Sequence, residues 1–129
     1  MKELHPKQIE AVLSLPAPRR YDHFVKQVAD SDEVWGLYND GWALASTDDG
    51  APTFPMWPAR EYAAMCATKD WAAFQPKSIP LEQFIDEFLP DLETKGILPS
   101  VFYTPEGLGV NASTMQLIED LREELKKYN

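Results

Sequence analysis

The chain has 129 residues, of which 44% are hydrophobic and 26% are charged, and its formal net charge is −9. This length indicates one domain that can bury a core without metals or disulfides. An acidic surface repels the phosphates of nucleic acids and anionic membranes, so we expect neither as a partner, whereas a basic protein would be attracted.

The first part of the chain predicts two short helices. Pro6 suits the first turn of a helix, and a Pro-rich break at residues 15–18 separates this helix from the next one. Pro18 can open the second helix. Its apolar residues recur at i, i+3, i+4 and i+7: Tyr21, Phe24, Val25 and Val28.

Three strands joined by tight turns are predicted next, at residues 33–38, 42–46 and 53–56. Asn39-Asp40-Gly41 is a strong hairpin signal between the first two strands, and we expect Trp35 and Trp42 to pair across that hairpin. Because Pro55 cannot donate a backbone hydrogen bond, the third strand is expected to be an edge or to pair on one side only near its end. Tight turns of this kind predict an antiparallel meander.

Two further helices and a strand follow. Pro58 begins a helix, and residues 71–79 are expected to be irregular or weakly extended. Ser78 or Pro80 opens the helix with the clearest apolar period, and Pro90 within it is expected to kink or split it. The core face of this helix consists of Leu81, Phe84, Ile85, Phe88, Leu89 and Leu92.

The last part of the chain predicts one strand and one helix. Gly96 is a natural helix stop, residues 97–103 favour a strand, and residues 104–107 a turn. Ser113 to Gln116 has capping-box spacing and leads into a final amphipathic helix. The order of these elements predicts one two-layer α+β domain over residues 1–129, an antiparallel sheet of about four strands covered by helices.

Cysteine usage and hydropathy indicate the compartment. The single cysteine, Cys66, excludes an intrachain disulfide and therefore a disulfide-stapled secreted scaffold. The segment before Pro6 lacks the apolar region of a signal peptide, and no apolar run approaches the roughly 18 residues that a membrane span needs. The sequence therefore predicts a cytoplasmic protein.

The usual constellations of catalytic and metal-binding residues are missing from the sequence. His5 and His23 are the only histidines and have no metal-ligand spacing, so we expect no metal site. Cys66 lies on an apolar helix face, where a thiol packs as a small hydrophobe. Gly107-Leu108-Gly109 lacks the third glycine and the lysine of phosphate loops and is interpreted as a turn. We predict no catalytic residue and no cofactor.

The helix over residues 81–94 carries five acids and no base. Glu82, Asp86 and Glu93 share the face opposite its apolar residues, so this face is a strip of unbalanced negative charge. Two interpretations are open: a solvated face of the helix, or a docking strip for a basic protein partner.

The tryptophans are the remaining candidates. Trp35, Trp42, Trp57 and Trp71 are many for this length, and aromatic residues fill cores or build ligand pockets and interfaces. A pocket lined by Trp57, Arg60 and Trp71 is one hypothesis. In it, Arg60 and Glu61 at the start of a helix would orient a polar ligand.

A set of motifs is distributed along the chain. It comprises Phe54-Pro55-Met56-Trp57-Pro58, Ala63 or Ala64, Trp71, Ile79-Pro80-Leu81-Glu82-Gln83-Phe84 and Val101-Phe102-Tyr103-Thr104-Pro105. On these motifs the chain resembles, over roughly residues 15–125, a family of short bacterial proteins catalogued only as a domain of unknown function. Tyr103-Thr104 departs from the pattern, in which the proline follows the strand directly. The resemblance implies no catalytic residues.

Three functions follow from these observations. The leading hypothesis is a non-enzymatic cytoplasmic protein-binding module, similar in character to the bacterial immunity proteins and antitoxins that neutralise toxins. The alternative is a small-ligand-binding protein or weak enzyme with a Trp-lined pocket. The third is an oligomeric structural protein that uses the edge near Pro55 or the last helix as its contact, and the sequence leaves the oligomeric state open.

Overall fold

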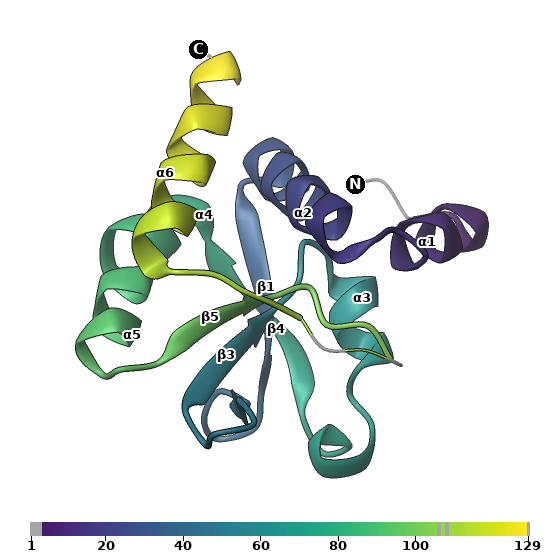
Figure 1. Cartoon of the computed structure of the whole chain (residues 1–129). Helices are drawn as coiled ribbons and strands as arrows, with labels where there is room; N and C mark the ends of the chain where they lie inside the picture. The colour runs from purple at the N-terminus through teal and green to yellow at the C-terminus, as the bar shows by residue number, and fades with distance from the viewer. Residues whose placement is uncertain (1–3, 106, 108, 129) are drawn as a thin grey trace.

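A computed structural model describes residues 4–105, 107 and 109–128 of the chain. It begins with two helices, α1 (Pro6–Leu13) and α2 (Ala17–Ser31), separated by the predicted Pro-rich break. Helix α2 ends at Asp32, which has a left-handed φ of 65° and whose carbonyl accepts a hydrogen bond from Leu81 N–H at 3.0 Å. Figure 1 shows α1, α2 and the C-terminal helix α6 (Thr114–Leu125) on one side of the strands.

The first strand, β1 (Glu33–Tyr38), pairs antiparallel with β4 (Gln75–Pro80). The predicted hairpin between residues 33–38 and 42–46 is therefore wrong, although the chain does turn at Asp40, whose φ is 58°. Only a single bridge, from Tyr38 to Trp42, remains of it among the described residues.

The reason lies at Gly36. A Cβ on this residue would lie 2.9 Å from Cζ3 of Trp42, so the indole packs over the backbone of β1 rather than beside it.

A second sheet has the order β2-β3-β5-β6. Its strands are β2 (Ala45–Ser46), β3 (Pro52–Met56), β5 (Leu98–Val101) and β6 (Val110–Asn111). Strands β3 and β5 are parallel, whereas the outer pairs are antiparallel, so the α+β class is confirmed but the all-antiparallel meander is corrected to a mixed sheet. The physical reason is the long helical crossover between β3 and β5, which returns the chain in the same direction.

Strand β3 lies inside the four-stranded sheet, between β2 and β5. It pairs with β2 only at Pro52 and Thr53 and with β5 as far as Met56, which confirms that it pairs on one side only near its end. Pro55 itself is buried.

The two sheets meet just beyond β3. Trp35 and Trp57 exchange backbone hydrogen bonds of 2.9 and 2.8 Å, so Trp35 pairs with Trp57 and not, as predicted, with Trp42.

Residues 81–94 form one continuous helix with the predicted apolar face. It consists of α4 (Leu81–Gln83), a π turn η2 (Phe84–Phe88) and α5 (Leu89–Thr94). The wide turn lies directly before Pro90, which has no N–H and whose ring would clash with the carbonyl four residues earlier in a regular helix. The proline is therefore accommodated by the π turn, in place of a break.

The remaining helices are short except for α6. They are α3 (Arg60–Met65), η1 (Lys69–Trp71), α6 (Thr114–Leu125) and η3 (Lys126–Tyr128). The hydroxyl of Ser113 accepts a hydrogen bond from the N–H of Gln116 at 3.1 Å, which confirms the predicted cap of α6.

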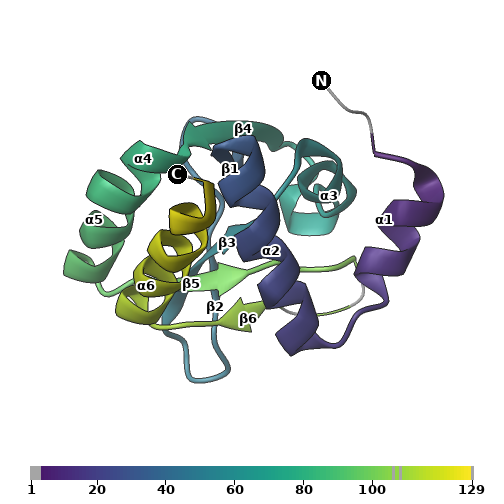
Figure 2. The ribbon, with the colours of Figure 1, turned by 90° about the horizontal axis from the view of Figure 1, so that it is seen from above.

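Helices α2 and α6 lie side by side over the sheet, as the view from above shows (Figure 2). Tyr21 of α2 donates a hydrogen bond of 2.6 Å to Asp120 of α6. The buried apolar side chains form one cluster, which includes Phe24, Trp57 and Leu117. We find no helix in the described part of the chain that is long and apolar enough to span a membrane.

Candidate functional site

The acidic helix, residues 81–94, exposes its carboxylates as the sequence predicts. Glu82, Asp86 and Glu93 are all exposed, and so is Glu87. Asp86 differs from the others because Nη2 of Arg122 lies 3.1 Å from its carboxylate. The sequence prediction of an unbalanced strip missed this base, since it comes from α6 and not from the same helix.

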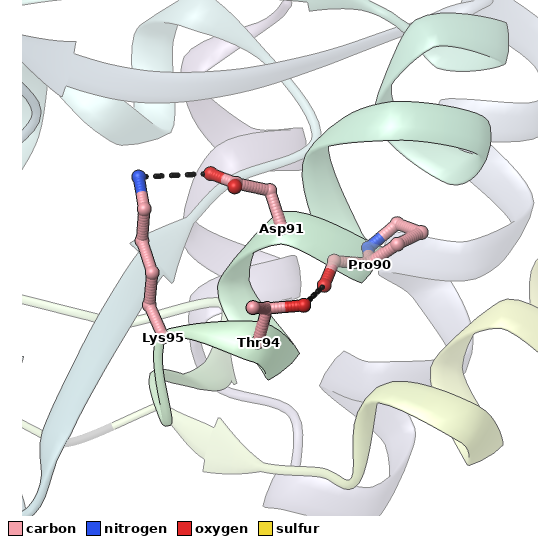
Figure 3. A network of polar contacts seen from close by, with 4 residues as sticks. All are labelled: Pro90, Asp91, Thr94 and Lys95. Atoms are coloured by element: carbon pink, nitrogen blue, oxygen red, sulfur yellow. Dashed lines mark hydrogen bonds and ion pairs between the residues drawn. The ribbon is translucent and has the colours of Figure 1, made fainter.

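Polar side chains at the C-terminal end of the acidic helix form local contacts with one another and with the backbone (Figure 3). Nζ of Lys95 lies 2.9 Å from the carboxylate of Asp91, and the hydroxyl of Thr94 donates to the carbonyl of Pro90 at 3.1 Å. Both partners of the ion pair are largely exposed, so the pair contributes little to stability.

The two lysines that follow α6 are paired as well. Lys126 and Lys127 pair with Glu123 and Glu124 within the C-terminal end of the chain. Within residues 4–105, 107 and 109–128, Glu82, Glu87 and Glu93 therefore have no ion-pair partner. Glu82 and Glu93 belong to the strip, and Glu87 is a further exposed acid of the same helix; below we call these three carboxylates, which are free to meet a cation, the acidic triad.

Trp57 is a core residue. Its side chain is fully buried, its Nε1–H donates to the carbonyl of Tyr103 at 2.9 Å, and its ring meets Trp71 edge-on at a centroid distance of 6.2 Å. Because Trp57 is buried, it does not form a wall of a surface pocket; Trp71 lines a cleft to which neither Trp57 nor Arg60 contributes. Arg60 is exposed at the start of α3, and Glu61 beside it is half-buried.

The cleft that contains Trp71 has a volume of about 740 Å³. One wall comes from β2 and the residue before it, a second from η1, and a third from the segment that follows β5. Its most prominent side chains are Trp71 and Tyr103, whose rings meet at 5.6 Å and 66°. Lys69 and Asp70 stand at its rim and are exposed.

Tyr103, Lys69 and Asp70 were not predicted as site residues from the sequence. A signal for Tyr103 was present, because Tyr103-Thr104 is where the chain departs from the pattern it resembles. Lys69 and Asp70 gave no signal, since they lie in a stretch without regular periodicity.

Cys66 also lines the cleft, with its thiol directed at the protein. The Sγ donates to the carbonyl of Tyr103 at 3.6 Å, so that carbonyl accepts from both Trp57 and Cys66. Burial raises the pKa of the Cys66 thiol to about 11. A thiol with so high a pKa is protonated at neutral pH and is a poor nucleophile.

The remaining candidates have structural partners. The ring of His23 shares a hydrogen bond of 2.8 Å with Gln27 and packs against Phe102. Among the residues whose structure is described, no group of three or more His, Cys, Asp or Glu could hold a metal ion. Gly107 pairs with Thr104 in a tight turn, as predicted for this segment, whereas Leu108 of the Gly-Leu-Gly motif lies outside the described residues.

Comparison with known proteins gives one match. A family model described as "Protein of unknown function (DUF2750)" matches residues 21–121. This range contains the acidic helix, the cleft and the first part of α6. Neither the curated proteins nor the solved structures include a match.

Proposed function

The chain belongs to the DUF2750 family of unknown function, and we propose from its own surface that it is a non-enzymatic module that binds a basic protein. The partner's cations meet the acidic triad, Glu82, Glu87 and Glu93. The module acts in the cytoplasm as an inhibitor, in the manner of an immunity protein or antitoxin.

One observation carries this proposal: three exposed carboxylates on one helix have no ion-pair partner among the described residues, while Lys95 and Arg122 are paired with Asp91 and Asp86 of that helix. A chain with a net charge of −9 also attracts a basic partner over a distance, which accelerates association at low salt. The neighbouring Asp86–Arg122 pair lies on the same surface and can exchange partners on docking.

The experiment compares three tagged proteins in affinity purification from the lysate of the host. They are the native chain, the variant E82Q/E87Q/E93Q, and the matched control E10Q/D30N/D48N, which removes three exposed acids elsewhere. We expect a stoichiometric basic protein on the native chain and on the control, and its loss from the triad variant. With the purified partner, the triad variant should bind about tenfold more weakly, and rising salt should weaken the native complex.

The design separates the triad from the net charge, because both variants change the net charge equally. A partner that stays on the triad variant, or that leaves both variants equally, contradicts the proposal. A capture without any partner contradicts it too.

A further inference from the structure

The cleft beside Trp71 has a rigid aromatic wall. Trp71 and Tyr103 are half-buried, both line the cleft, and their rings meet at an angle of 66°. Trp57 fixes both from behind: its ring meets the edge of Trp71, and its indole N–H holds the backbone of Tyr103. An aromatic ring that enters the cleft thus meets surfaces already in place, which reduces the entropic cost of binding.

The rim of the cleft carries two opposite charges. Lys69 and Asp70 are neighbours in the sequence and are both exposed. In the described part of the chain, neither has an ion-pair partner. Lys69 has a left-handed φ of 53°, and its carbonyl accepts a hydrogen bond from Ala72 N–H at 3.1 Å, so the turn holds the two side chains at the rim.

The backbone of β2 supplies a donor and an acceptor. Strand β2 is the edge of its sheet, and Thr47 N–H donates to the carbonyl of Ala51 at 2.8 Å. Hydrogen bonds alternate along an antiparallel pair, so the N–H and C=O of Ser46 point away from β3, toward the free edge. Pro52 stands opposite Ser46 and has no N–H to offer, which agrees with this alternation. Ser46 lines the cleft.

We propose that this cleft binds a free aromatic α-amino acid. Its carboxylate accepts from Ser46 N–H and pairs with Lys69, and its ammonium group donates to the Ser46 carbonyl and pairs with Asp70. Its ring lies against Trp71 and Tyr103. A zwitterion can form an ion pair with Lys69 and with Asp70 at once, whereas a simple anion or cation can pair with only one of them. The volume of about 740 Å³ is in the range of small-molecule sites.

This inference is independent of the acidic triad, which lies on another element. The probe is L-phenylalanine, with binding measured by calorimetry and by the tryptophan fluorescence of the protein. Three analogues each lack one feature: 3-phenylpropionate the ammonium group, L-phenylalaninamide the carboxylate, and L-alanine the ring. A fourth, N-acetyl-L-phenylalaninamide, lacks both charges.

We expect saturable binding of L-phenylalanine and at least about tenfold weaker binding of each analogue, because charge-assisted hydrogen bonds are the strong ones. The variants Lys69→Asn and Asp70→Asn should each weaken binding about tenfold as well. Asn tolerates the left-handed backbone at residue 69, so the fold is kept. The control variants Lys26→Gln and Asp48→Asn, at exposed sites outside the cleft, should bind as the native chain does.

Three results would overturn the proposal. The first is no binding of L-phenylalanine by the native chain. The second is equal binding of 3-phenylpropionate or L-phenylalaninamide, which would remove the zwitterion. The third is equal binding of N-acetyl-L-phenylalaninamide, which would assign the cleft to an extended peptide paired with β2.

Discussion

The acidic helix and the aromatic cleft are built in opposite ways. The helix places its carboxylates through local spacing, on a surface where Glu82 and its neighbours touch solvent. The cleft gathers Trp71 and Tyr103 from segments that are distant in sequence, and a fully buried Trp57 holds them together. A charged surface that comes from residues of a single helix tolerates substitution. A cleft that depends on contacts between distant segments is lost when the buried residue that supports it is removed.

The largest expected effect tests that support. Trp57→Ala removes a fully buried indole and its hydrogen bond, so we expect a loss of about 3–5 kcal/mol in the free energy of unfolding. Trp57→Phe keeps the ring contact with Trp71 and should cost clearly less. Denaturant unfolding of both variants measures this. A Trp57→Ala protein as stable as the native chain would mean that the cleft does not depend on its back wall.

Alkaline pH should lower the stability of the fold. Burial raises the pKa of Cys66 from 9.0 to about 11 and that of Tyr62 from 10.0 to about 12. Between these values the unfolded chain has released protons that the folded chain still holds, so stability falls as pH rises from 9 toward 12. Thermal unfolding at pH 8 and pH 10.5 measures the fall, which we expect to be smaller than that of Trp57→Ala.

The variant Cys66→Ala sharpens this test, because it removes the thiol's share of the pH dependence and leaves the shares of Tyr62 and Tyr21, whose pKa values burial also raises. An identical pH dependence in native chain and variant would show that the thiol titrates normally. The acidic helix should add nothing here, since carboxylates are already ionised at these pH values.

A smaller effect of opposite sign is expected in the sheet. The hydroxyl of Thr53 is buried and has no hydrogen-bond partner among the described residues. Thr53→Val removes this unsatisfied group at nearly constant shape, so we expect a gain of about 1 kcal/mol in the free energy of unfolding. Denaturant unfolding checks it. A loss of stability would mean that a buried water or a partner satisfies the hydroxyl.

The acidic triad should barely affect folding. E82Q/E87Q/E93Q changes exposed side chains without ion-pair partners in the described chain, so we expect unfolding free energies within about 0.5 kcal/mol of the native value. Thermal and denaturant unfolding would detect a larger change. A strong loss of stability would place these carboxylates in the scaffold, and the contrast with the cleft would disappear.

The smallest effect concerns the pair Asp86–Arg122, which in the described part of the chain is the one ion pair between the acidic helix and α6. Both side chains are about half exposed, so a double-mutant cycle of Asp86→Asn and Arg122→Gln should give a coupling of about 0.5 kcal/mol or less. Added salt should reduce it further. A coupling above about 1.5 kcal/mol would show that this ion pair contributes more to stability than an ordinary surface pair does.

What could be predicted from the sequence follows the same division. The period of apolar residues from Leu81 to Leu92 predicts its helix correctly, and the caps at Gly96 and Ser113 are where they were expected. These are local signals, in which a residue and its neighbours determine the backbone.

Strand pairing was not predictable in this way. The turn at Asp40 is present, but the partner of β1 is β4, whose residues include Pro76 and Pro80 and carry little strand pattern. The parallel pairing of β3 with β5 depends on contacts between distant segments, which local propensity does not encode.

The candidate sites divide likewise. The acidic residues were named from helical spacing, but the base Arg122 beside Asp86 comes from another helix and was missed. Of the aromatic residues, Trp71 was named and Tyr103 was not, because the cleft exists only once β5 has placed Tyr103 beside Trp71.

The parallel pairing of β3 with β5 also sets when the molecule can fold. Thr53 pairs with Leu98, so residues 57–97 must all be synthesised before β3 can pair with β5. Non-local pairing of this kind slows folding, since loop closure must precede the contacts that reward it. During translation, a nascent chain that ends before residue 98 exposes one side of β3 as an unpaired edge, open to pairing with another chain. The native sheet can therefore form only after β5 has been synthesised, and we expect aggregation to begin from the ribosome-bound chain that lacks β5.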